Sequence, residues 1–84
     1  MKHMVEVDEH RELARQIAVL RREADEMEAV AAEIYATAPR LYGGGSFEMV
    51  AAVDEADGYR REAAQWRAQA AQAEKHLIEM REGA

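Results

Sequence analysis

The sequence predicts an all-α protein: an antiparallel hairpin of two long helices, coiled-coil-like, with an alanine-rich seam. In each of two runs, apolar residues recur in alternating steps of three and four, which is the spacing of helices packed side by side. A single glycine-rich stretch, Gly43–Gly45, separates the two runs and acts as the point about which they mirror each other. We expect two such hairpins to dimerise into a four-helix bundle.

The first helix is expected over about residues 6–38. Most of its residues outside the apolar run are good helix formers. Pro39 is expected to end it, because proline disfavours helical geometry in the residue before it. The predicted seam positions in this helix are Leu13, Ile17, Leu20, Ala24, Met27, Ala31, Ile34 and Ala38.

A turn over about residues 39–46 is expected to reverse the chain, and a second helix is expected over about 47–82. The turn residues are Pro39, Gly43, Gly44, Gly45 and Ser46. Ser46 is a natural N-cap for the second helix. Gly58 weakens that helix by roughly 1 kcal/mol relative to alanine, but the apolar spacing continues through it. The predicted seam positions in this helix are Met49, Ala52, Ala56, Tyr59, Ala63, Trp66, Ala70, Ala73, Leu77 and Met80.

The two runs form matched layers when residues whose numbers sum to 90 are paired. The layers run from Ala38 with Ala52 to His10 with Met80, and most set a large side chain against an alanine. Tyr59 and Trp66 are therefore interpreted as core residues, not as a ligand slot. The large seam residues are Leu13, Ile17, Leu20, Met27, Ile34, Tyr59, Trp66, Leu77 and Met80.

Length and composition favour self-association. The chain has 84 residues, 18 of them alanine, and no cysteine that could form a disulfide. A two-helix hairpin of this size buries little apolar area. We therefore expect a homodimer or a higher homo-oligomer.

Charge and hydropathy argue against nucleic-acid and membrane partners. The net charge is −6, and each half of the chain carries −3. Nucleic-acid binding is disfavoured by this charge, and no apolar run is long enough to span a membrane. We expect a cytoplasmic protein, with secretion without a cleavable signal peptide as the alternative.

The "MKHM" start and the "GGGS" stretch are also consistent with engineered segments.

No catalytic, cofactor-binding or metal-binding residues are expected, and the chain is not expected to be an enzyme. The "YGGGSF" stretch lacks the lysine and the preceding strand of a phosphate loop. His10 and His76 lie near the same end of the hairpin, but no His pair spaced four apart and no Glu-x-x-His pair accompanies them. A structural histidine is the favoured interpretation of His10.

The centre of the chain resembles the tryptophan-x-glycine helical-hairpin family of type VII secretion substrates. Tyr42-Gly43-Gly44 stands at the matching central position, with tyrosine in place of the family's tryptophan. The tail "HLIEMREGA" lacks the tyrosine of the family's export motif. The resemblance implies a secreted hairpin dimer that acts as an effector or adaptor.

Three functions follow from these features. The first is a non-catalytic interaction or assembly protein that presents Leu41, Tyr42 and Phe47 at the hairpin tip to an unidentified protein partner. The second is the type VII-like secreted substrate. The third is a small regulator that binds nucleic acid through a basic strip, which consists of Arg11, Arg15 and Arg22.

Overall fold

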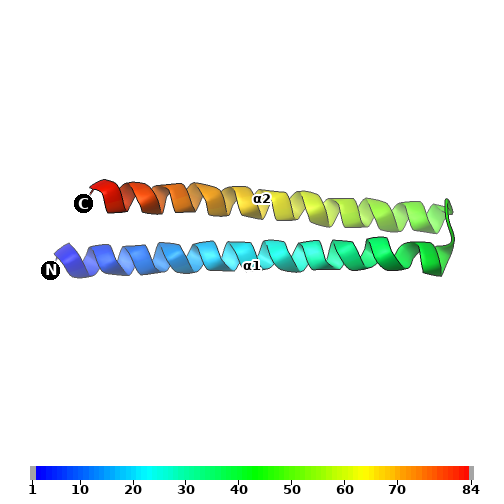
Figure 1. The fold of residues 1–84 in the computed structure, drawn as a ribbon, viewed down its shortest axis with the longest axis horizontal. Coiled ribbons are helices and arrows are strands. Elements are labelled where there is room, and N and C mark those ends of the chain that lie inside the picture. The colour runs from blue at the N-terminus through cyan, green and yellow to red at the C-terminus, as the bar shows by residue number, and fades with distance from the viewer. Residues whose placement is uncertain (1, 84) are drawn as a thin grey trace.

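The structure, a computed structural model, describes residues 2–83, with side chains described for residues 8–83. Helix α1 spans Lys2–Tyr42 and helix α2 spans Phe47–Gly83. The helices lie antiparallel and side by side, with both termini at one end and the connection at the other (Figure 1). The Cα atoms fill a rod of 63 × 15 × 12 Å. The described residues therefore form an all-helical hairpin without strands, as the apolar spacing predicts.

The buried residues lie on the predicted seam and recur every seven positions in each helix. The residues between the buried ones, such as Leu20, Met27 and Trp66, are half-buried. Alanine dominates the buried positions, so the close approach of the helices depends on small side chains. The buried residues among those described are Ile17, Ala24, Ala31 and Ala38 in α1, and Ala56, Ala63, Ala70 and Leu77 in α2.

One apolar cluster lies toward the end of the rod that carries the termini. Ile17, Ala70 and Leu77 are its buried members. Leu13, Leu20 and Ala73 pack against them, and these six residues make up three of the layers expected from the pairing of the two runs. The cluster thus brings together the residues that this pairing places opposite each other.

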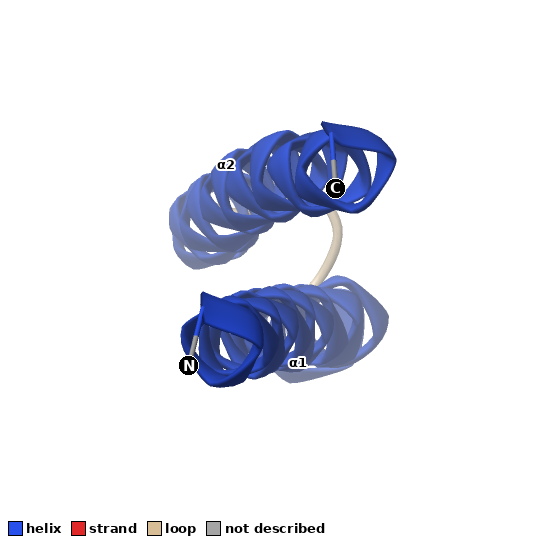
Figure 2. Cartoon of the chain, turned by 90° about the vertical axis from the view of Figure 1, so that its left-hand side faces the viewer, coloured by secondary structure: helices blue, strands red, loops and turns tan. Residues whose placement is uncertain are grey.

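Each helix has only one helical neighbour. Viewed along the rod, the two helices cross at an angle, and no other element of the described chain covers either side (Figure 2). None of the largest side chains among residues 8–83 is fully buried. A long stretch of each helix surface therefore faces solvent.

The expectation that Pro39 ends the first helix is wrong. Helix α1 continues past Pro39 to Tyr42, and its ribbon is irregular near this green end (Figure 1). Proline removes one backbone hydrogen bond, the one to the carbonyl four residues earlier, while later residues can still bond normally. The Gly43 amide donates to the Pro39 carbonyl at 3.1 Å, which extends the helical pattern by one turn. The first helix also starts earlier than residue 6, at Lys2, and the second ends at Gly83.

The connection is consequently shorter than the 39–46 turn expected from the sequence. Gly43 and Gly45 have φ values of 75° and 79°, a left-handed conformation that favours glycine. The Met49 amide donates to the Ser46 hydroxyl at 3.2 Å, which is the N-cap hydrogen bond expected for α2. The tight reversal thus explains two of the three glycines, and Gly44 has open space around it.

Helix α2 runs through Gly58 without interruption. Neither described helix contains a segment that is long and apolar enough to cross a membrane.

Candidate protein-interaction site

The hairpin tip exposes a group of large apolar side chains. Leu41 is 70% exposed and Phe47 is 83% exposed, and Tyr42 is also exposed. Val50, one turn after Phe47, is a fourth exposed member that the sequence analysis did not place at the tip. The sequence could have identified Val50, because it follows Phe47 by three residues and residues three apart lie on one face of a helix. We call these four residues the tip.

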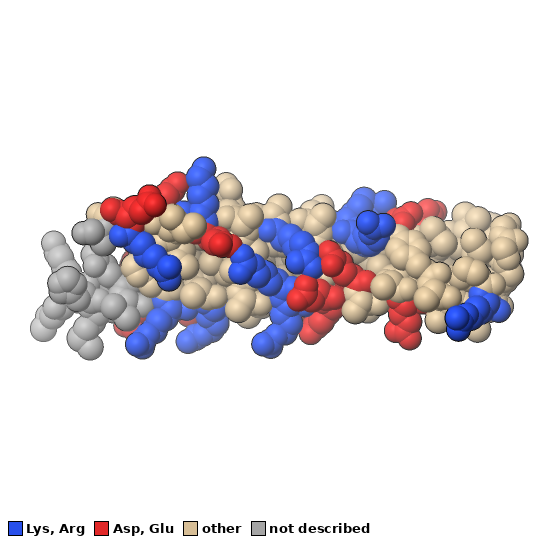
Figure 3. All heavy atoms as spheres, viewed as in Figure 1, with Lys and Arg blue, Asp and Glu red and all other residues tan. Residues whose placement is uncertain are grey.

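Few charged residues lie near the tip. Between Ala36 and Val53 the only charged residues are Arg40 and Glu48. In Figure 3 the end of the rod that carries the turn is mostly uncharged on the face shown, whereas charged side chains crowd the middle. Water-exposed apolar side chains on a rigid helix end are typical of protein-binding anchors.

Polar contacts between the helices gather along one edge of the seam. Arg67 donates to both carboxylate oxygens of Glu28, at 2.9 and 2.8 Å, and to Asp25 at 2.7 Å. Arg21 is paired with Glu74. Each contact joins one residue of α1 to one residue of α2, 39 to 53 positions apart in the sequence. The contacts therefore help to fix the register of the two helices.

An aromatic contact continues this edge toward the tip. The Tyr35 hydroxyl donates to Asp57, and the Arg60 guanidinium carbon lies 6.0 Å from the centre of the Tyr35 ring. In each helix three of the four contacting residues recur every seven positions, and the fourth, Asp25 or Asp57, lies one helical turn before one of them, so all follow one edge of the seam. We call this edge the paired flank, and its residues are Arg21, Asp25, Glu28, Tyr35, Asp57, Arg60, Arg67 and Glu74.

The Arg67 contacts shift the pKa of Glu28. The hydrogen bond from Arg67 lowers the pKa of Glu28 below its ordinary value of 4.5, against the opposing effect of desolvation. Because the folded-state pKa is the lower one, this pair stabilises the fold above the unfolded-state pKa, and the stabilisation is lost as pH falls through the folded-state pKa. Solvent screening keeps the effect small for side chains this exposed.

Tyr35 shows the opposite direction. Its pKa is raised because the hydroxyl donates to the Asp57 carboxylate, so the proton is held more tightly. The hydroxyl therefore remains protonated and can serve as a donor throughout the neutral range.

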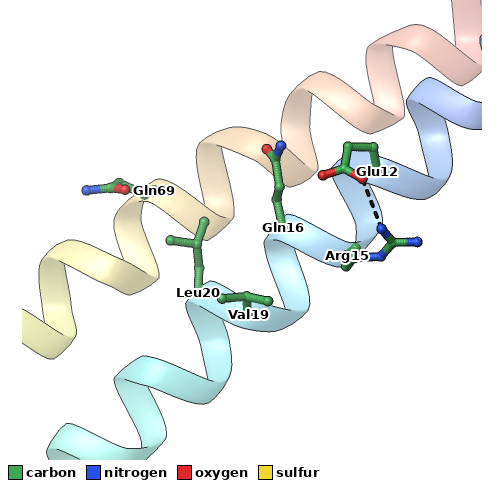
Figure 4. Close-up of a pocket in the computed structure, with 6 residues that line it drawn as sticks. All are labelled: Glu12, Arg15, Gln16, Val19, Leu20 and Gln69. Atoms are coloured by element: carbon green, nitrogen blue, oxygen red, sulfur yellow. Dashed lines mark hydrogen bonds and ion pairs between the residues drawn. The ribbon is translucent and has the colours of Figure 1, made fainter.

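A surface hollow lies on the other edge of the seam. Its volume is about 380 Å³, and its lining residues are Glu12, Arg15, Gln16, Val19, Leu20 and Gln69. Figure 4 shows Gln16 and Leu20 pointing from α1 toward α2, while Arg15 turns away and pairs with Glu12 at 3.2 Å. Apolar Val19 and Leu20 beside polar and charged side chains suit the contact of another helix.

The remaining candidate residues lie apart from these features. His10 is half-buried and His76 is exposed. Among the described residues no group of three or more His, Cys, Asp or Glu side chains is placed to hold a metal ion. Arg11, Arg15 and Arg22 are all exposed, and Arg15 pairs within its own helix. Tyr59 and Trp66 are half-buried at the seam.

Comparisons with protein families, with curated proteins and with solved structures found no match to this chain. The chemistry of the described side chains, above all the apolar tip and the two edges of the seam, therefore provides the basis for a functional proposal.

Proposed function

We propose that this chain is a non-catalytic protein-interaction or assembly protein that works as a homodimer of helical hairpins. The observation that carries the proposal is the exposed surface. The chain exposes 6403 Å², whereas a compact monomer of its mass exposes about 5,000 Å². The excess, roughly 1,400 Å², exceeds the ~800 Å² that one partner buries in a standard interface.

The paired flank is the face best suited to a second copy. Exposed alanines lie one helical turn before its members, for example Ala18 before Arg21 and Ala64 before Arg67. Small side chains allow helices to approach closely. This face has three arginines and four acidic residues, and most of them form ion pairs within one hairpin, so a second copy meets a nearly neutral surface.

The tip is the proposed contact for a different protein. In a dimer joined along its length, the helix ends stay accessible, and Leu41, Tyr42 and Phe47 project from the closed end of each hairpin. Exposed aromatic side chains on a rigid support lose little conformational entropy when they are buried, so they make effective anchors.

Replacing Tyr42 and Phe47 together with alanine tests this role. Because both side chains are exposed, we expect the melting temperature to change by less than about 3 °C. Affinity for a partner captured with the wild-type protein from its native host should fall at least tenfold, that is by about 1.4 kcal/mol or more. Isothermal titration with the purified partner measures the loss.

Ile78→Ala is the matched control, since Ile78 is a comparably exposed apolar residue far from the tip. It should leave the affinity unchanged. Equal affinities for the tip variant and the control would contradict the proposal, and unfolding of the tip variant would show that the tip is structural.

A further inference from the structure

The two edges of the helix seam differ in their polar contacts. The cross-helix hydrogen bonds and ion pairs among residues 8–83 all lie on the paired flank. The opposite edge consists of the residues that come just before the buried positions, such as Gln16, Glu23, Gln69 and His76. None of these four side chains forms a cross-helix hydrogen bond within that described range. We call this edge, together with the residues one turn away from it, the open flank.

The open flank is strongly acidic. Among residues 8–83, Arg40 is the only positively charged residue at these positions. Arg15 also lines the hollow, from the neighbouring position, where it pairs with Glu12, the only acidic member of the open flank in an ion pair. The open flank has a net charge of −8, whereas the rest of the described side chains sum to +2. Its acidic members are Glu9, Glu12, Glu23, Glu26, Glu33, Glu48, Glu55, Glu62 and Glu79.

Apolar seam residues are accessible along the same edge. The hollow at Val19 and Leu20 adjoins a second hollow of about 400 Å³ that contains Leu13 and Met80. Glu12 and Gln16 line both, so the two hollows form one groove. Leu13 and Leu20 are seven residues apart, which corresponds to about 10.5 Å along a helix. Side chains at positions i and i+7 of a third helix have the same spacing.

We propose that the open flank binds a basic amphipathic helix of a partner protein, whose apolar face lies in the groove and whose lysine or arginine side chains meet the glutamates. The inference rests on the proposed role as an interaction protein, but it concerns a different surface from the tip. The helix would complete a three-helix arrangement on each hairpin.

Charge selects this occupant over a second copy. A symmetric dimer through the open flank would bring the same glutamates of both copies together, and like charges at an interface weaken binding. The paired flank has no such excess. A basic helix instead gains Coulomb attraction as well as burial of Leu13, Leu20 and Val19.

The test uses a synthetic amphipathic peptide of about three heptads, with leucine on one face and lysine and arginine elsewhere. A matched peptide carries glutamate in place of the basic residues. Fluorescence anisotropy should show that the basic peptide binds the full chain and that its affinity falls as ionic strength rises. The acidic peptide should not bind.

Two sets of variants with equal changes in charge locate the site. Glu9→Gln, Glu23→Gln and Glu79→Gln together should weaken binding roughly tenfold. Asp8→Asn, Asp54→Asn and Glu82→Gln together alter the same net charge outside the open flank and should change affinity less than about twofold. Similar losses in both sets would show general charge attraction and overturn the proposal.

An apolar pair tests the groove itself. Val19→Ser should weaken peptide binding several-fold, whereas Ile78→Ser, a similarly exposed residue outside the groove, should not. If Val19→Ser lowers the sedimenting mass and the wild type does not bind the peptide, a second copy occupies the groove and the proposal is wrong. The tip variant should bind the peptide like the wild type, so failure here is distinguishable from failure of the tip.

Discussion

Replacing Ala31 with leucine is expected to destabilise the fold by about 2–3 kcal/mol, the upper part of the range for overpacked cores. Ala31 is 1% exposed and lies midway along the seam, where neighbouring buried positions of both helices are also alanine. A leucine there has to push the helices apart or adopt a strained rotamer. Chemical denaturation followed by circular dichroism measures the change.

Ala29→Leu is the control for this substitution. Ala29 is exposed in the same helix, and leucine and alanine have similar helix propensities. The control should change the free energy of unfolding by less than about 0.5 kcal/mol. Equal tolerance of leucine at both positions would show that the helices do not depend on small side chains at the seam.

Truncating Ile17 to alanine is expected to cost about 2–4 kcal/mol, because isoleucine-to-alanine changes in cores lose both transfer free energy and packing. Ile17 is one of the few large residues that are buried, and it packs with Leu77 in the apolar cluster. The effect should be seen as a lower denaturation midpoint with little change in the slope of the transition.

Val19→Ala provides the comparison, two residues away in the same helix but 51% exposed. It should destabilise the chain by less than about 1 kcal/mol. If the two variants lose similar stability, the cluster around Ile17 does not hold the helices together.

The helices and the buried stripe could be predicted from the sequence because both depend on local periodicity. Ala24, Ala56 and Ala63 lie at positions that recur every seven residues, and such positions face a packed neighbour. Ser46 could be identified as a cap because its hydroxyl acts within one turn. These features need no knowledge of how the helices are rotated against each other.

The helix end and the two flanks could not be predicted in the same way. Proline disfavours a helix on average, but Pro39 removes one backbone hydrogen bond and the hydrogen bond from Gly43 to Pro39 still forms, so the helix continues for a further turn. The pairing of Arg67 with Glu28 depends on the rotation of both helices about their axes. Charge patterns along each helix do not contain that rotation, so they do not predict these contacts between the helices.

The tip falls between these cases. Leu41, Tyr42 and Phe47 stood out as apolar residues next to glycines, but their exposure depends on the extra helical turn after Pro39 and on the tight reversal at Gly43 and Gly45.

Sedimentation equilibrium of the full chain at micromolar concentrations measures whether the hairpin forms the proposed homodimer. We predict a mass twice that of the 9.5 kDa chain, with helical circular dichroism that is lost as the dimer dissociates on dilution. A fully helical chain that sediments as a 9.5 kDa monomer up to the highest concentration would show that the hairpin folds and works without a second copy, contrary to the proposed homodimer.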